Sequence, residues 1–251
     1  MNGAICAGGH NETMSPRKST PEEIRRRFDA DVERFSNLET GQSATIDAPL
    51  SLELIARAAA GVRPEASTLL DIGCGAGNYT LKLLQYLPLR AVTLIDLSRP
   101  MLDRAVERVH AAAPAVDVVA IQSDIRETTL PAAAFDVAVA AAALHHLRDE
   151  DEWRQVFAAV HRALVPEGSF WISDLVTHQS AAIHGVMWQR YGEYLASLKG
   201  PEYRDHVFAY VEAEDTPRPL SWQLDLLART GFREVDVLHK NSCFAAFGGI
   251  K

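Results

Sequence analysis

Short apolar runs alternate with longer amphipathic segments through the middle of the chain. The apolar runs are rich in aliphatic side chains and cover residues 69–72, 91–95, 116–122, 135–143 and 169–174. Most of the segments between them have the three- and four-residue apolar spacing of a helix. Strands that alternate with helices predict a parallel doubly wound α/β sheet, which binds its ligands at the carboxyl ends of the strands.

Two further helices are predicted before this alternation. Thr20, Pro21 and Glu23 form a capping box with proline at the first helical position, and apolar spacing extends the helix over residues 21–36. We expect its apolar face to pack, with a cover over the active site as the alternative. A polar loop over residues 36–45 follows. A second helix is then predicted from Asp47 to Gly61.

The alternation changes after residue 174. Residues 178–212 carry many aromatic side chains and form a predicted helical insertion that is interrupted near the Lys199-Gly200-Pro201 segment. A helix over residues 221–230 then precedes two strands, 234–239 and 243–247, joined by a short turn. This pattern predicts an antiparallel hairpin at the end of the sheet.

Composition supports one globular domain. The chain has 251 residues, 47% of them hydrophobic, which is enough to bury a large core. Residues 1–19 are rich in Gly, Ser and Asn, and we expect a disordered arm there and a single domain over residues 20–251. The net charge of −8 favours a small-molecule substrate and makes nucleic acid an improbable partner.

Cysteines and apolar runs point to a cytoplasmic protein. Cys6, Cys74 and Cys243 are odd in number and lack metal-ligand spacing, so we expect reduced thiols and no metal site. No apolar run is long enough to span a bilayer, and the first residues lack the pattern of a signal peptide. The sequence therefore predicts no membrane partner.

A glycine-rich turn follows the first apolar run. Glycines at positions 73, 75 and 77 let a ligand approach bare backbone. The third glycine comes one residue too early for a dinucleotide-binding turn, so NAD is disfavoured. Asp96 ends the next apolar run, where its carboxylate can accept both hydrogen bonds of a ribose diol. Together these features indicate an adenosine-containing ligand.

The segment D-x-G-x-G-x-G, residues 71–77, resembles the first motif of the class I S-adenosylmethionine-dependent methyltransferases. F-D-V-x-V at 135–139 and L-H-H-L at 144–147 extend the resemblance, which covers residues 66–251. It implies a Rossmann-like seven-stranded sheet of order 3-2-1-4-5-7-6, with the last strand antiparallel and a helical insertion after strand five. It also implies S-adenosylmethionine as cofactor and S-adenosylhomocysteine as product.

The resemblance places the cofactor contacts at the carboxyl ends of strands. Leu97 and Met101 would sandwich the adenine ring, Asp124 would accept from its amino group, and Ala141 would contact the methionine portion. Core packing for Met101 and a capping or solvated role for Asp124 are the alternatives. The complete expected set is Asp71, Gly73, Cys74, Gly75, Asn78, Asp96, Leu97, Met101, Asp124, Ile125 and Ala141, with Gln42 and Thr45 as further contacts.

Substrate and catalytic residues follow from the insertion and from the histidine pair. The insertion resembles the substrate lid of the family, and Trp188, Tyr191, Tyr194 and Arg204 are its expected pocket residues; core or oligomer contacts are the alternative. His145 ends strand four with its side chain toward the cleft as a general base for a hydroxyl acceptor, whereas His146 is expected to be packed or exposed. A structural role for both histidines is the alternative.

These features favour methyl transfer to a small-molecule acceptor by in-line displacement. Three alternatives remain: a carboxy-S-adenosylmethionine synthase in which Arg204 holds the added carboxylate, a tRNA- or protein-modifying enzyme, and a cofactor-binding regulator without activity. The acceptor and the oligomeric state, including a homodimer, are left open.

Overall fold

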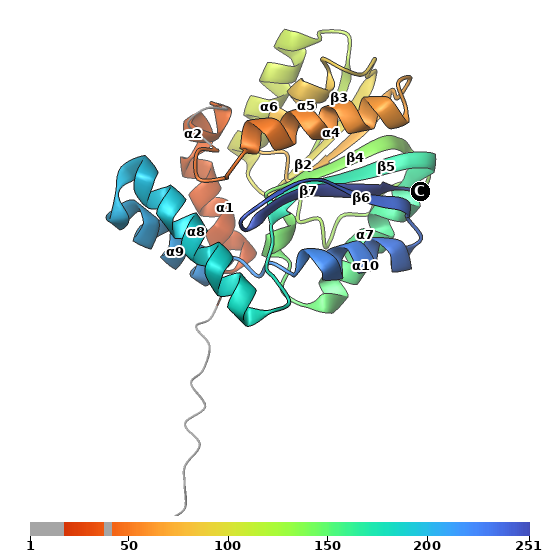
Figure 1. The fold of residues 1–251 in the computed structure, drawn as a ribbon. Helices are drawn as coiled ribbons and strands as arrows, with labels where there is room; N and C mark the ends of the chain where they lie inside the picture. Colours follow the sequence, from red (N-terminus) through yellow and green to blue (C-terminus); the bar gives the residue numbers. More distant parts are fainter. Residues whose placement is uncertain (1–17, 38–41) are drawn as a thin grey trace, which may run out of the picture.

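The computed structural model describes residues 18–37 and 42–251. The arm predicted for residues 1–19 lies almost wholly outside these residues. The described chain contains a seven-stranded sheet of order β3-β2-β1-β4-β5-β7-β6 (Figure 1). The strands are β1 (Thr68–Ile72), β2 (Ala91–Asp96), β3 (Asp117–Gln122), β4 (Phe135–Ala141), β5 (Leu164–Leu175), β6 (Arg233–Asn241) and β7 (Phe244–Ile250).

The pairing confirms the predicted fold class. Strands β1 to β5 run parallel to one another, whereas β7 is antiparallel to both of its neighbours, β5 and β6. β4 is shorter than predicted because Ala142 has a positive φ of 50°, which turns the chain out of the strand. β5 begins earlier than predicted, at Leu164, which pairs with Phe135 before an irregularity in the register.

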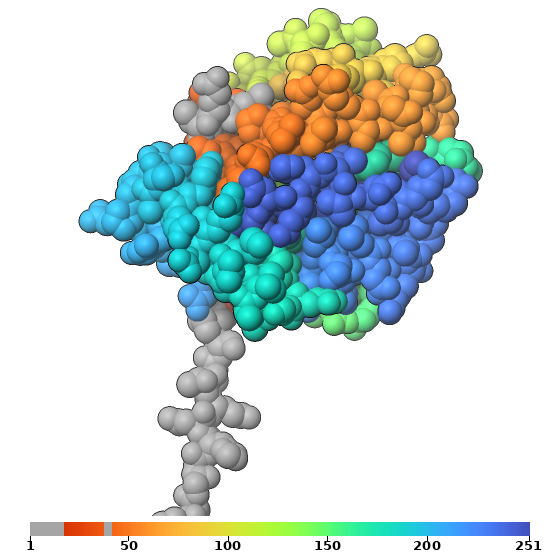
Figure 2. Space-filling model, viewed as in Figure 1, coloured from red at the N-terminus to blue at the C-terminus, as the bar shows by residue number. Residues whose placement is uncertain are grey.

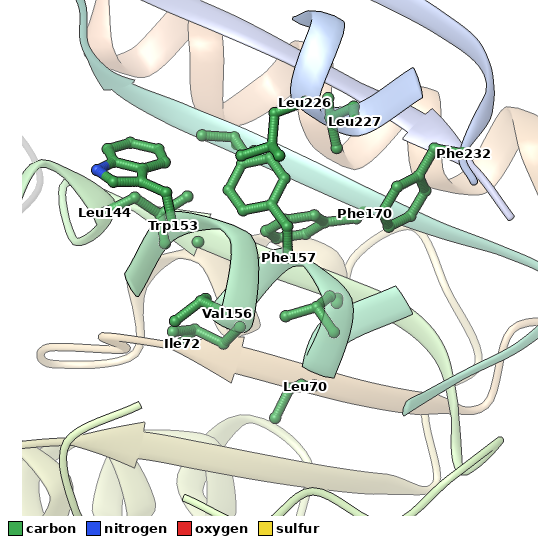
Figure 3. Close-up of a cluster of buried hydrophobic side chains, with 14 of the residues drawn as sticks. Leu70, Ile72, Leu144, Trp153, Val156, Phe157, Phe170, Leu226, Leu227 and Phe232 are labelled. Atoms are coloured by element: carbon green, nitrogen blue, oxygen red, sulfur yellow. The ribbon is translucent and has the colours of Figure 1, made fainter. Parts of the chain in front are cut away.

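Helices cover both faces of the sheet (Figure 1). On one face lie α4 (Ala48–Val62), α5 (Asn78–Leu83) and α6 (Arg99–Ala112), and on the other lie α7 (Glu150–Ala163) and α10 (Leu220–Thr230). Side chains alternate along β1. Leu69 therefore joins the first core layer, between the sheet and α4, α5 and α6, and Leu70 and Ile72 join the second, between the sheet and α7 and α10. Figure 3 shows Trp153 and Phe157 of α7 in the second layer, near Leu226 and Leu227 of α10.

The predicted helix over residues 21–36 is two helices, α1 (Pro21–Ala30) and α2 (Val32–Ser36). Asp31 separates them with φ −111° and ψ 14°, and its N–H bonds to the carbonyl of Phe28, three residues back, instead of that of Arg27, four residues back. The expected capping box is present, because Thr20 and Glu23 exchange hydrogen bonds at the start of α1. Both α1 and α2 pack against α6.

The insertion after β5 is a helical pair, as predicted. It consists of α8 (Ala181–Lys199) and α9 (Pro201–Glu214), which pack against each other. Figure 2 shows the pair as a lobe beside β6 and β7. A short 3₁₀ helix, η1 (Leu144–His146), lies between β4 and α7. Within the described residues, every helix is too short or too polar to cross a lipid bilayer.

Candidate cofactor pocket and active site

A cavity of about 200 Å³ opens at the carboxyl ends of β1, β2 and β4. All eleven residues predicted to contact a cofactor border it, as do Gln42 and Thr45 of the preceding loop. Further bordering residues that were not among the expected cofactor contacts include Pro21, Ile24, Phe28, Phe35, Arg126, His146, Leu147, Asp174 and Phe244. Strand ends and the N-terminal helices therefore share one cavity.

The glycine turn forms the floor of the cavity with backbone. Gly73, Gly75 and Gly77 have φ values of 66°, 50° and 81°, in the region that side chains other than glycine rarely adopt. A Cβ on Gly73 would lie 2.6 Å from the Ala143 Cβ, whereas a Cβ on Gly75 would meet open space. Because Gly75 borders the cavity, the bare backbone leaves room there for a ligand.

Two carboxylates stand beside this turn, Asp71 fully buried and Asp96 partly buried. Asp96 accepts the N–H of Gly75 through Oδ2 and the N–H of Ser98 through Oδ1, both at 2.8 Å, so its orientation is fixed. Asp71 accepts the Thr80 hydroxyl at 2.6 Å. Burial raises the pKa of Asp96 to about 6 and that of Asp71 to about 7. Both carboxylates favour a ligand that brings positive charge or hydrogen-bond donors.

Asp124 is held by a side chain that the sequence did not single out. Both of its carboxylate oxygens bond to the Arg126 guanidinium, which also bonds to Glu152. Burial opposes the ionised form of Asp124, but the bonds from Arg126 outweigh it and lower its pKa. Asp124 thus faces the cavity as an oriented, ionised acceptor.

His146, and not His145, borders the cavity, which is the reverse of the expectation. The predicted orientation of the His145 side chain toward the cleft is therefore wrong. The Nδ1–H of His145 donates to Asp174, whose carboxylate also accepts the N–H groups of Leu144 and His145. The 3₁₀ turn of η1 directs consecutive side chains in different directions, and the bond to Asp174 fixes the orientation of His145.

Their charge states differ as well. Burial lowers the pKa of His145, but the carboxylates of Asp174 and Asp215 outweigh burial and raise it to about 9. Burial, followed by the charge of His145 and of Arg148, lowers the pKa of His146 well below its usual value. The imidazole at the cavity is therefore neutral at pH 7.

Apolar side chains also border the cavity. They are Ile24 and Phe28 of α1, Phe35 of α2, Leu147 after η1 and Phe244 of β7. The ring centroids of Phe28 and Phe35 are 5.5 Å apart, and those of Phe28 and His146 are 6.1 Å apart. The apolar face of the N-terminal helix therefore covers the site, which is the alternative that the sequence left open.

The four insertion residues predicted to line the substrate pocket do not border this cavity. Trp188 stacks on Phe208 at 4.4 Å, and Tyr191 packs on the same ring, so both join the core between α8 and α9. The Tyr194 hydroxyl donates to the Ser43 carbonyl. Arg204 lies on the surface and pairs with Asp205. The aromatic side chains that the sequence analysis assigned to a substrate pocket therefore pack between α8 and α9 instead.

The chain matches a family model for a methyltransferase domain over residues 69–168. It is 32% identical over 158 residues to an uncharacterised methyltransferase of Mycobacterium bovis, covering 56% of this chain and 76% of the relative. The chain belongs to the class I S-adenosylmethionine-dependent methyltransferases. It is also 32% identical over 176 residues to a 27-O-demethylrifamycin SV methyltransferase of Amycolatopsis mediterranei, covering 66% of this chain and 62% of that one.

Solved methyltransferase structures share the fold. A 1,6-didemethyltoxoflavin-N1-methyltransferase of Burkholderia thailandensis, solved with S-adenosylhomocysteine bound, superposes with a TM-score of 0.61 at 17% identity over 93% of this chain and 91% of that one. The cofactor of the present methyltransferase is S-adenosylmethionine, and its product is S-adenosylhomocysteine. The cavity fits this group chemically: bare backbone at Gly75 leaves space, and the oriented carboxylates would suit its cations and hydroxyls.

Proposed function

We propose that this methyltransferase transfers a methyl group to an apolar small-molecule acceptor by in-line displacement. The observation that carries the proposal is the mixed lining of one cavity. The glycine turn, Asp71 and Asp96 supply polar groups, and Ile24, Phe28 and Phe244 supply apolar ones. We infer that the polar groups form a donor end and the apolar residues an acceptor end, within a single water-poor space.

The chain's own contribution is alignment. Bound S-adenosylmethionine supplies an electrophilic methyl group on a sulfonium. We infer that Asp96 holds the ribose, Asp71 faces the charged end, and Leu97 and Met101 enclose the base. Phe28 and Phe35 exclude water and orient the acceptor. Holding two reactants in line removes several kcal/mol of the barrier without a covalent intermediate.

Relatives support a small-molecule acceptor. The Amycolatopsis relative is named as a 27-O-demethylrifamycin SV methyltransferase, and the Burkholderia neighbour was solved with 1,6-didemethyltoxoflavin bound. The alternatives gain no such support. Arg204, which a carboxylated cofactor would require, is outside the cavity and paired with Asp205. A net charge of −8 opposes a tRNA-binding face.

We also propose that residues 20–251 act as one methyltransferase domain. In this proposal the insertion of residues 178–212 acts as a substrate lid. The segment that follows the insertion is bonded to η1, because the Thr216 N–H donates to the His145 carbonyl and Arg148 bonds to the Thr216 hydroxyl.

The test is turnover of S-adenosylmethionine against a panel of acceptors. The panel contains apolar hydroxyl, amine and thiol compounds, together with bulk tRNA and a protein extract. We expect S-adenosylhomocysteine to form only with apolar small molecules. Tight cofactor binding with no acceptor turned over, or turnover of tRNA alone, would refute the proposal.

A variant pair locates the acceptor end. Phe28→Ala should raise KM for the acceptor and leave cofactor affinity unchanged, because Phe28 is among the apolar residues that border the cavity. Val186→Ala is the control, since Val186 is an aliphatic residue of α8 with 61% exposure that does not border the cavity.

A further inference from the structure

Three potential metal ligands from distant parts of the sequence meet beside the cavity. His145 and His146 lie in η1, and Asp215 follows α9. Asp215 Oδ1 is 3.6 Å from His145 Nε2 and 3.4 Å from His146 Nδ1. One ligand atom from each residue falls within 4.8 Å of the others.

The cluster holds polar atoms that lack partners. Asp215 is 5% exposed, and its Oδ1 has no hydrogen-bond partner among the described residues. Both ring nitrogens of His146 are likewise buried without a hydrogen bond within the described chain. Leaving buried polar atoms unpaired destabilises a folded chain. A cation between them would satisfy the carboxylate oxygen and the imidazole nitrogens at once.

His145 is prepared as a ligand by its neighbour. Its Nδ1–H donates to Asp174, which leaves Nε2 on the side of Asp215, and an ion that binds there displaces the proton that Nε2 carries at pH 7. A histidine that binds a metal through one nitrogen usually donates its other N–H to a carboxylate in this way, because the bond fixes the tautomer and the ring orientation. Asp174 is itself fixed by the N–H groups of Leu144 and His145.

We propose that His145, His146 and Asp215 form a binding site for one divalent transition-metal ion such as Zn²⁺, Co²⁺ or Fe²⁺. Two imidazole nitrogens and one carboxylate oxygen suit these ions, whereas Mg²⁺ and Ca²⁺ prefer oxygen ligands alone. The distances of 3.4 and 3.6 Å match a tetrahedron with metal–ligand bonds of about 2.1 Å, whose edge is about 3.4 Å. Three protein ligands leave a position for an oxygen ligand.

The cations around the cluster have partners of their own. Arg148 donates to the backbone carbonyls of Ser19 and Glu214, and Lys18 donates to those of Glu212 and Asp215. Arg27 pairs with the Glu214 carboxylate. The carboxylates of Asp174 and Asp215 are the acidic groups that face the two histidines.

A second cluster, His178, His184 and Cys243, has similar spacing but is less suited. The Lys240 ammonium lies 2.9 Å from His178 Nε2 and would place a positive charge beside the ion. The Nδ1 atoms of His178 and His184 are 3.5 Å apart and already pair with each other. This cluster supplies the control for the experiment.

This inference deepens the proposed function and rests on it, because His146 borders the cavity. An ion bound by His146 would lie beside the acceptor. A hydroxyl oxygen that coordinates the ion loses its proton to water more readily, since the ion stabilises the resulting oxyanion. The acceptor would then be an apolar molecule that carries a hydroxyl group.

The test measures metal binding directly. The chelator-treated full chain is titrated with Co²⁺ and Zn²⁺ by calorimetry, with Mg²⁺ as the hard-ion control, and the visible spectrum of the Co²⁺ form is recorded. His146→Gln and Asp215→Asn remove one ligand each, and His184→Gln disrupts only the second cluster. S-adenosylmethionine affinity and thermal unfolding are measured for every variant without metal.

We expect one Co²⁺ per chain, with a ligand-field spectrum and no sulfur-to-cobalt charge-transfer band. Both ligand variants should lose at least about tenfold in metal affinity and retain cofactor binding, and His184→Gln should match the unaltered chain. Absence of binding, a thiolate band, or affinity that depends on His184 would overturn the inference. Failure of S-adenosylmethionine to bind the unaltered chain would instead count against the proposed function.

Discussion

The buried carboxylate of Asp71 should make folding stability depend on pH. Asp71 is 1% exposed, and burial raises its pKa from 3.8 to about 7. Below the lower value the group is protonated in both the folded and the unfolded chain. Between the two values the unfolded chain releases the proton and the folded chain keeps it, so stability falls as pH rises. Above about pH 7 the dependence ends.

The magnitude follows from the size of the shift. A rise from 3.8 to about 7 is about 3 pH units, and each unit corresponds to 1.36 kcal/mol, which gives about 4 kcal/mol in total. Asp71→Asn removes the ionisation and keeps an oxygen that can accept the Thr80 hydroxyl. The variant should therefore gain stability relative to the unaltered chain as pH increases.

Urea denaturation at a series of pH values provides the assay. Between about pH 4.5 and pH 8 the difference in unfolding free energy between Asp71→Asn and the unaltered chain should grow by about 3 kcal/mol. Asp96 also has a raised pKa, of about 6, but it is present in both chains and largely cancels in the difference. Parallel pH curves for the two chains would show that Asp71 ionises normally and would refute the reasoning.

Two further substitutions test the turn and the core. Gly73→Ala should destabilise the chain by about 1–3 kcal/mol and abolish measurable S-adenosylmethionine binding. The reason is that φ at this position is 66° and the new Cβ would lie 2.6 Å from the Ala143 Cβ. Urea denaturation measures the first effect and calorimetry the second. Phe157→Ala should lower the free energy of unfolding, measured by urea denaturation, by about 3–5 kcal/mol, since the fully buried ring contacts those of Trp153 and Phe170. Cofactor affinity, measured well below the unfolding transition, should stay unchanged.

Features that depend on local sequence were predictable. The alternation of apolar runs and helical segments predicted the parallel strands, and resemblance supplied the sheet order and the antiparallel last strand. Glycine spacing and Asp96 directed attention to one end of the sheet, where the eleven expected cofactor residues border a single cavity. Each of these residues lies in a strand end, in a turn or, for Asn78 and Met101, in the first turn of a helix, so its position follows from its own element.

Features that depend on contacts between distant segments were not predictable. Which histidine of η1 faces the cavity depends on Asp174, which lies in β5. The aromatic stripe of α8 packs on Phe208 of α9, and periodicity alone does not distinguish such a contact from a pocket wall. Asp215 meets His145 and His146 only because the insertion returns to the sheet, so no local spacing indicates that cluster.

The most direct test of the account is the affinity of the chain for S-adenosylmethionine with and without the Asp96 carboxylate. Charge-assisted hydrogen bonds contribute about 1.5–3 kcal/mol each, so Asp96→Ala should weaken binding roughly 10- to 100-fold in calorimetric titration. Asp117→Ala is the matched control, because Asp117 is an exposed aspartate at the opposite end of the neighbouring strand β3. Weakened binding in the first variant alone is the predicted result. Unchanged affinity in Asp96→Ala, or an equal loss in Asp117→Ala, would contradict the account.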